Sequence, residues 1–243
     1  MQSLVTFDFH NTLATCDPWF ELEIRDLPAE ALARIDPAFV PDRDDVTARY
    51  RRLREEVMRS GREVDAVEGV DRIARQLGLA IDEATIAASV RDLMREATRH
   101  AAPVPGAIEA VRQIAAQGIP VGVISSAVYH PFLEWTLEAF GLGDDLAFVV
   151  TSASSGHYKS NPEIYRYAMR LVDADPASSV HIGDSPKWDV WGAQQAGMSA
   201  VWFSNGFTGT FVDREHESEP DAVVTTMNDV APWVLRHLGK NDR

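Results

Sequence analysis

The chain has 243 residues, a formal net charge of −14 and a single cysteine, Cys16. Its acidic balance provides no broad positive field for a nucleic-acid backbone, and it contains no run of about 18 apolar residues, so we expect neither nucleic-acid binding nor membrane insertion. One cysteine cannot form an intrachain disulfide, and the first residues lack a signal-peptide pattern, so we expect a cytoplasmic protein.

Short apolar segments rich in β-branched residues recur along the chain, and each ends at a polar residue or a turn. We predict strands at residues 4–8, 120–125, 146–152, 179–184, 199–203 and 221–226. Helical patterns separate most of them, at residues 105–118, 161–172, 188–197 and 228–238. Because strands that alternate with helices pair in parallel, the sequence predicts an α/β fold with a doubly wound parallel sheet.

Residues 16–102 interrupt this alternation with helical patterns only. Residues 44–60 and 82–100 each carry apolar side chains at helical spacing along one face. We therefore predict a helical domain at 16–102, inserted into a core domain formed by residues 1–15 and 103–243. We predict that four arginines of the first helix form a solvated face, with the alternative that one of them reaches a substrate anion: Arg49, Arg51, Arg52 and Arg54.

Three predicted strands end in side chains that bear oxygen, namely Asp8, Ser125 and Asp184. Ligands of an open parallel sheet bind beyond the carboxyl ends of its strands, so we expect these side chains to converge. Lys159, one of only three lysines, follows another strand and lies near the same edge. Facing carboxylates need a cation between them, for which Mg²⁺ is suited, and a hydroxyl with an ammonium suits phosphoryl oxygens.

Four segments resemble, in order and spacing, the motifs of the haloacid dehalogenase superfamily. They are "TFDFHNTLA" around Asp8, "VGVISSA" around Ser125, "GHYKSNPEIY" around Lys159, and "HIGDSPKWDVWGAQQAGM" around Asp184 and Asp189. Each motif alone is weak, but four in order are specific. The predicted helical insert occupies the place of that family's helical cap. The resemblance therefore covers essentially the whole chain and implies a Rossmann-like core with an α-helical cap, as in the phosphatase-like branch of subclass I.

The resemblance implies an Mg²⁺-dependent hydrolase that cleaves a small phosphomonoester. Asp8 would be the nucleophile and would form an aspartyl-phosphate that water then hydrolyses. Mg²⁺ would be held by the Asp8 carboxylate, the backbone carbonyl of His10, and Asp184. Asp189 would contribute to the metal site directly or through a ligand, or would only cap the helix that begins near Trp188.

The implied phosphate-binding groups come from three of the motifs. Their residues are Thr12, Ser125, Ser126 and Lys159. Ser125 and Lys159 would stabilise charge on the phosphoryl oxygens, and Ser126 would share or take the role of Ser125. The expected partner is a small phosphorylated metabolite, and we expect a monomer or a homodimer.

The first motif departs from the phosphatase pattern at two positions. His10 stands where most phosphatases of this family carry a second aspartate as general acid and base, and Asn11 replaces the usual glycine. Asparagine tolerates left-handed backbone angles, so we expect the turn to be preserved. Histidine is itself competent in proton transfer, and we expect His10 to take this catalytic role.

Two other interpretations remain open. One is a 2-haloacid dehalogenase that attacks carbon, although that branch works without Mg²⁺ and usually lacks the acid that matches Asp184. The other is a non-catalytic protein that keeps the fold and binds a ligand. A phosphonate-cleaving enzyme is disfavoured, because that branch needs a lysine in the cap and residues 16–102 contain none.

Overall fold

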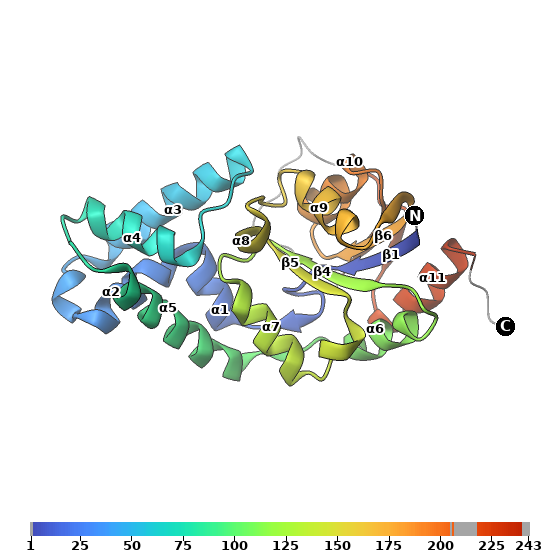
Figure 1. Ribbon diagram of the computed structural model, residues 1–243, viewed down its shortest axis with the longest axis horizontal. Coiled ribbons are helices and arrows are strands. Elements are labelled where there is room, and N and C mark those ends of the chain that lie inside the picture. The colour runs from blue at the N-terminus through green and yellow to red at the C-terminus, as the bar shows by residue number, and fades with distance from the viewer. Residues whose placement is uncertain (1, 205, 207–217, 240–243) are drawn as a thin grey trace.

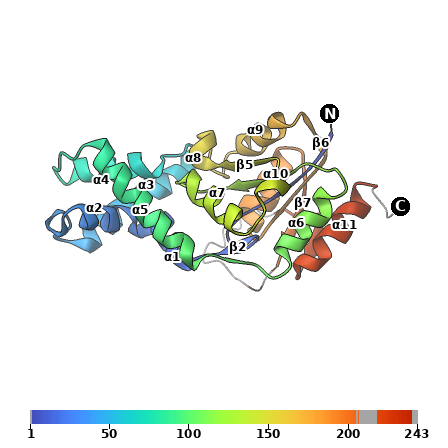
Figure 2. The same cartoon turned by 60° about the horizontal axis from the view of Figure 1, so that its bottom comes forward.

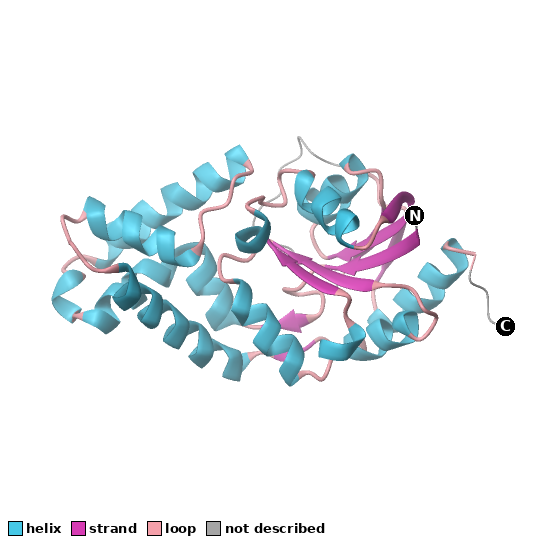
Figure 3. Cartoon of the chain, viewed as in Figure 1, coloured by secondary structure: helices cyan, strands magenta, loops and turns pink. Residues whose placement is uncertain are grey.

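A six-stranded parallel sheet forms the centre of the protein. Strands are drawn as magenta arrows in Figure 3. The computed structural model describes residues 2–204, 206 and 218–239. The strands lie in the order β5 (Phe148–Thr151), β4 (Val121–Ser125), β1 (Gln2–Phe7), β6 (Ala174–Gly183), β7 (Ser199–Phe203) and β8 (Ala222–Val224). Every pairing within it is parallel, so the predicted α/β class is confirmed.

Helices cover both faces of this sheet, because successive side chains of a strand point to opposite sides. On β1, Leu4 packs into one apolar cluster, whereas Val5 and Phe7 pack into the other. The first cluster includes residues of α9 (Glu163–Leu171) and α10 (Gly192–Gln195). The second includes residues of α6 (Ala107–Ala115), α7 (His130–Ala139) and α11 (Val230–His237). Figure 2 shows α6 and α11 side by side on this second face.

Several elements differ from the predicted ones in extent or type. Strand β6 begins at Ala174 because its register with β1 shifts between Gln2 and Leu4, which lets an irregular stretch join the strand. The predicted helix at 188–197 is a π-helical turn, Pro186–Trp191, followed by α10. Helix α7 and the short α8 (Ser152–Ser155) were not predicted. The sequence also predicts a solvated acidic loop at 213–220, of which residues 213–217 lie outside the described residues.

Residues 16–102, here called the helical region, gather at one end of the sheet (Figure 1). Their elements are α1 (Asp17–Glu21), a π-helical turn (Leu22–Asp26), α2 (Leu27–Ile35), a 3-10 turn (Pro37–Phe39), α3 (Arg43–Ser60), α4 (Ala66–Gln76), α5 (Glu83–Ala97) and a second 3-10 turn (Thr98–His100). The chain enters and leaves through two short antiparallel strands, β2 (Ala14–Thr15) and β3 (Ala102–Pro103). None of the helices in the described ranges is long and apolar enough to cross a membrane.

Aspartate caps fix where three helices of this region begin. The side chain of Asp42 accepts a hydrogen bond from Asp45 N at the start of α3. Asp65 and Asp82 do the same at the starts of α4 and α5. Each cap satisfies a backbone donor that the first helical turn leaves unpaired.

Helix α3 buries one charged side chain that the sequence places on a solvated face. Arg51 and Arg52 are exposed and Arg49 is half-buried, as that prediction requires. Arg54 is only 6% exposed, because its guanidinium forms an ion pair with the buried Glu63. The prediction is therefore wrong for Arg54.

Candidate active site

The carboxyl ends of three adjacent strands bring the predicted site residues together. Asp8 follows β1 directly, Ser125 is the last residue of β4, and Asp184 follows β6 directly. Because β1 lies between β4 and β6, these three residues lie at one edge of the sheet. Lys159 reaches this edge from the segment between α8 and α9, and Asp189 from the π-helical turn after β6.

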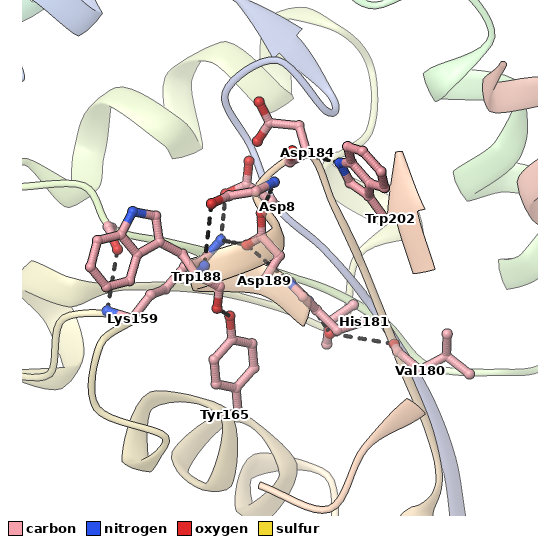
Figure 4. Close-up of polar contacts among 12 residues, drawn as sticks. Asp8, Lys159, Tyr165, Val180, His181, Asp184, Trp188, Asp189 and Trp202 are labelled. Carbon is pink, nitrogen blue, oxygen red and sulfur yellow. Dashed lines mark hydrogen bonds and ion pairs between the residues drawn. The ribbon is translucent and has the colours of Figure 1, made fainter. Parts of the chain in front are cut away.

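Lys159 joins two of the carboxylates, as the dashed lines in Figure 4 show. Its Nζ atom lies 2.5 Å from Asp8 Oδ1 and 2.6 Å from Asp189 Oδ1. Burial lowers the pKa of Lys159, but the charges of Asp189 and Asp8 outweigh it and raise that pKa above its ordinary value. Lys159 therefore carries a positive charge between two negative ones, in a site where it is only 2% exposed.

Asp184 brings a third carboxylate to the same place. Oxygen atoms of Asp8, Asp184 and Asp189 all lie within 4.8 Å of one another. Burial, together with the charges of Asp8 and Asp189, raises the pKa of Asp184 to about 8. Burial also raises the pKa of Asp8 to about 6, although Lys159 opposes this. Two carboxylates thus share one ammonium group and a third lies beside them, and this oxygen-rich set fits a hard divalent cation such as Mg²⁺.

Two backbone features place Asp189. Its Oδ2 accepts a hydrogen bond from Ser185 N at 2.9 Å. A Cβ atom added to Gly183 would lie 2.2 Å from Asp189 Cγ, so only glycine admits the carboxylate at this position. The cap of the following turn is Ser185, whose Oγ accepts from Trp188 N. The interpretation of Asp189 as a mere helix cap is therefore wrong.

Asp189 also forms a hydrogen bond with a buried histidine, which the sequence did not indicate as a site residue. His181 on β6 is fully buried, and its Nε2 lies 3.2 Å from Asp189 Oδ1 (Figure 4). Its Nδ1 lies 2.8 Å from Thr6 Oγ1. Because a carboxylate only accepts, Nε2 carries the proton and donates it, and Nδ1 accepts from the Thr6 hydroxyl. A polar residue two positions before Gly183, inside an apolar strand, was the signal available in the sequence.

The predicted phosphate-binding hydroxyls lie in different settings. Ser125 is 3% exposed. Ser126 Oγ accepts a hydrogen bond from Lys159 N at 3.3 Å, which links the two loops that carry the second and third motifs. Thr12 is fully buried, and its Oγ1 has no hydrogen-bond partner within the part of the chain that is described.

His10 lies among aromatic rings of the helical region. Its imidazole is nearly parallel to the ring of Phe20, with centroids 4.5 Å apart, and its centroid lies 5.4 Å from that of Trp19. Burial lowers the pKa of His10 to about 4, although Asp17 opposes this. Its Nε2 is buried and unpartnered among the described residues. Asn11 adopts the expected left-handed backbone, with φ of 60°.

Comparisons with known proteins found a matching family and several relatives. The family described as haloacid dehalogenase-like hydrolase matches residues 3–197. A glyceraldehyde 3-phosphate phosphatase of Pyrococcus furiosus is 26% identical over 70% of each chain. A probable phosphatase, IndB, of Dickeya dadantii is 31% identical over 63% of this chain and 68% of its own. An (S)-2-haloacid dehalogenase of Pseudomonas putida is 26% identical over 69% of this chain and 70% of its own.

Solved structures share the fold over nearly the whole chain. A 2-haloacid dehalogenase of Pseudomonas syringae pv. tomato superposes with a TM-score of 0.71 at 24% identity, over 97% of this chain and 99% of that one. A phosphatase of Thermococcus onnurineus superposes with a TM-score of 0.66 at 22% identity, over 96% and 98%. With the family match across most of its length, the chain belongs to the haloacid dehalogenase-like hydrolases and is an enzyme of that family.

Proposed function

We propose that this protein is an Mg²⁺-dependent phosphatase that hydrolyses a small phosphomonoester through an aspartyl-phosphate on Asp8. The observation that carries the proposal is the cluster of Asp8, Asp184 and Asp189 around Lys159. Phosphoryl transfer is catalysed mainly by positioning and by stabilising negative charge, which needs a metal site and a fixed cation. An enzyme that attacks carbon in a haloacid has no such need, so the three carboxylates favour the phosphatase.

The first half of the reaction would use Asp8, Lys159 and Ser125. An oxygen of Asp8 attacks phosphorus, the new O–P bond forms, and the ester P–O bond breaks. Lys159 and Ser125 hold the phosphoryl oxygens and stabilise their charge. The carboxylates of Asp8 and Asp184 and the carbonyl of His10 would hold Mg²⁺, with a direct or indirect contribution from Asp189, and the ion would supply further positive charge at these oxygens.

His10 would act as general acid in the first half of the reaction and as general base in the second. As imidazolium it gives a proton to the leaving oxygen, and as neutral imidazole it takes one from the water that attacks phosphorus and releases Asp8. A pKa lowered to about 4 favours the neutral form near pH 7, which suits the second half. A bound phosphate ester carries negative charge, which raises the pKa of a neighbouring imidazole and so favours the first half.

The helical region would act as a cap over the reacting groups, with residues 1–15 and 103–243 as the core domain. Phe20 and Trp19 from α1 lie against His10, beside the nucleophile loop. A cap of this kind excludes water and large surfaces, and so selects small substrates.

The experiment is phosphate release from a panel of small phosphomonoesters, with Mg²⁺ or with EDTA. We expect metal-dependent release that disappears in Asp8→Asn, with folding of the variant checked by circular dichroism. Halide release from 2-haloacids without added metal would instead establish the dehalogenase. Neither activity, in a folded protein, would favour the non-catalytic interpretation.

A further inference from the structure

Three buried ionisable side chains of the helical region lie close enough to influence one another's pKa. They are Glu23 in the π-helical turn, Arg54 on α3, and Glu63 between α3 and α4. Arg54 Nη1 lies 2.5 Å from Glu63 Oε1, and their side chains are 7% and 1% exposed. Glu23 is 4% exposed. Burying charges costs free energy that a well-packed apolar cluster would not cost, so these residues are weak candidates for a purely stabilising role.

Glu23 reaches out of the helical region to the loop after β4. Both of its carboxylate oxygens accept from Val128 N, at 2.9 and 3.1 Å. Val128 lies three positions after Ser125 and two after Ser126 in the sequence. The backbone that follows the predicted phosphate-binding serines is therefore held by an acid from the helical region.

The segment around Glu63 contacts the loop before Lys159. Glu63 N donates to Gly156 O at 3.0 Å, and Tyr158 N donates to Gly61 O at 3.1 Å. The guanidinium carbon of Arg54 lies 5.7 Å from the ring centroid of Tyr158, the residue directly before Lys159. The same cluster thus contacts the loops that carry both the serine motif and the lysine motif.

These two loops also contact each other. Ser126 Oγ accepts from Lys159 N, and Ala66 N, just beyond Glu63, donates to Val128 O at 2.9 Å. A shift of either loop against the helical region would therefore move the other. Catalytic groups of this kind lose activity when they are misplaced by about 1 Å.

We propose that Glu23, Arg54 and Glu63 are positioning residues, which hold the loops of Ser125 and Lys159 in the arrangement that the reaction needs. The inference rests on the proposed phosphatase function. It assigns these three side chains no contact with substrate. It makes the helical region part of the catalytic geometry, through two backbone segments of the core.

The charge balance of Glu23, Arg54 and Glu63 indicates which substitution of Glu23 should keep their arrangement. Burial raises the pKa of Glu23 to about 8, with Glu63 adding to the effect and Arg54 opposing it. A protonated Glu23 leaves Arg54 and Glu63 as a balanced pair. Glutamine has the shape of that protonated form and keeps an acceptor oxygen for Val128 N, whereas alanine removes the acceptor.

The first arm of the test is kinetic. With p-nitrophenyl phosphate and Mg²⁺, Glu23→Ala and Arg54→Met should lower kcat by about tenfold or more with little change in KM, because transition-state groups are misplaced. Glu23→Gln should restore most of kcat. The matched control is Arg34→Met, which removes an exposed ion pair with Glu96 from the same region and should behave as wild type.

The second arm does not depend on catalysis. Hydrogen–deuterium exchange of peptides spanning residues 126–130 and 156–160 should be faster in Glu23→Ala and Arg54→Met, and unchanged in Arg34→Met. If Arg54→Met fails to fold, Glu23→Ala carries the test, since it leaves the pair of Arg54 with Glu63 intact.

Together, the kinetic and exchange measurements distinguish a failure of the proposed phosphatase function from a failure of the proposed positioning role. A wild type that is inactive on the whole panel of phosphomonoesters, with the expected exchange pattern, would overturn the phosphatase function and leave the hold on the two loops supported. An active wild type whose Glu23→Ala variant keeps full kcat would overturn the positioning role, whatever the exchange shows. Unchanged exchange in both cluster variants would overturn the proposed hold on the loops.

Discussion

The imidazole of His10 and the ring of Phe20 lie within 13° of parallel, with their centroids 4.5 Å apart. The candidate acid and base of the core is therefore enclosed by an aromatic side chain of the helical region. This contact explains why burial is the first cause of the lowered pKa of His10. It also means that the setting of this candidate group depends on the position of α1.

The first prediction concerns His10→Ala. If His10 protonates the leaving oxygen, its loss should lower kcat on alkyl phosphates by about 10²-fold or more. The loss on p-nitrophenyl phosphate, whose leaving group needs no proton, should be smaller and reflect only the base role in the second half. His10→Asp should restore turnover of the alkyl esters. The measurement is kcat for both ester classes, with the exposed His100→Ala as control. An equal loss on both classes would contradict the acid role.

The second prediction concerns Gly183→Ala. The added Cβ would lie 2.2 Å from Asp189 Cγ, so the carboxylate must move away from Lys159. We expect a large loss of kcat with the fold retained. Gly143→Ala, where an added Cβ meets nothing within 4 Å, should retain full activity.

Gly122→Ala is a useful second control for that experiment. Its added Cβ would lie 2.3 Å from the ring of Phe148, away from the carboxylates. It should lower the thermal midpoint, because the core is overpacked. If Gly183→Ala lowers stability as much as Gly122→Ala and activity no further, the steric argument for Asp189 fails.

The third prediction concerns metal binding by the carboxylates. Saturating Mg²⁺ should raise the thermal midpoint of wild type by about 5–10 °C, since a ligand at 100 times its Kd adds about 2.7 kcal/mol. Asp184→Asn should lose this shift. In EDTA the variant should match or exceed wild type near pH 7, because the mutation removes a carboxyl whose pKa is raised by burial and by Asp8.

Differential scanning fluorimetry, with Mg²⁺ and with EDTA, measures both effects. Asp144→Asn, which changes an exposed acid outside the cluster, should respond to Mg²⁺ as wild type does. A full Mg²⁺ shift in Asp184→Asn would exclude Asp184 from the metal site.

The fourth prediction concerns the pH dependence of stability through Glu23. Burial raises the pKa of its carboxyl from an ordinary 4.5 to about 8, so the folded state binds this proton more tightly than the unfolded state. The contribution is fully present below about pH 4.5 and is lost as the pH rises through 8. Glu23→Gln removes this titration, so its free energy of unfolding should fall less than that of wild type between about pH 6 and pH 9.

Urea unfolding at a series of pH values in that range measures the difference. Glu109→Gln, which changes an exposed acid on α6, should follow the wild-type curve. Parallel curves for wild type and Glu23→Gln would mean that Glu23 is already ionised below pH 6.

Site residues that stand at strand ends could be predicted from the sequence. Site residues whose roles depend on contacts between distant parts of the chain could not. Asp8, Ser125 and Asp184 could be brought together because each ends a strand of a parallel sheet, and parallel strands end at the same edge. The role of His181 was not predicted, because its ring is held by a hydrogen bond with Thr6, 175 positions away, and a polar residue inside an apolar strand does not identify that partner. Arg54 was misread for the same reason, since on an isolated amphipathic helix a charged residue is expected to face solvent.

The elements show the same division. Short continuous apolar segments predicted the six strands, because a strand that is buried on both faces carries apolar side chains along its whole length. The π-helical turn at Pro186–Trp191 was not predicted, because its backbone depends on where Ser185 and Asp189 lie after folding. Resemblance to the family's motifs supplied the roles of these residues, which the pattern of apolar segments alone does not contain.

The left-handed backbone of Asn11 distinguishes two kinds of change in the loop that follows Asp8. A backbone with φ of 60° readily accepts glycine, asparagine and aspartate, so the backbone conformation limits which residues can occupy position 11. His10 is not among the described residues with positive φ, so the backbone sets no such limit at position 10. Evolution could therefore exchange aspartate and histidine at position 10 without rebuilding the loop. A single substitution at position 10 would then separate an enzyme that uses aspartate as acid and base from one that uses histidine.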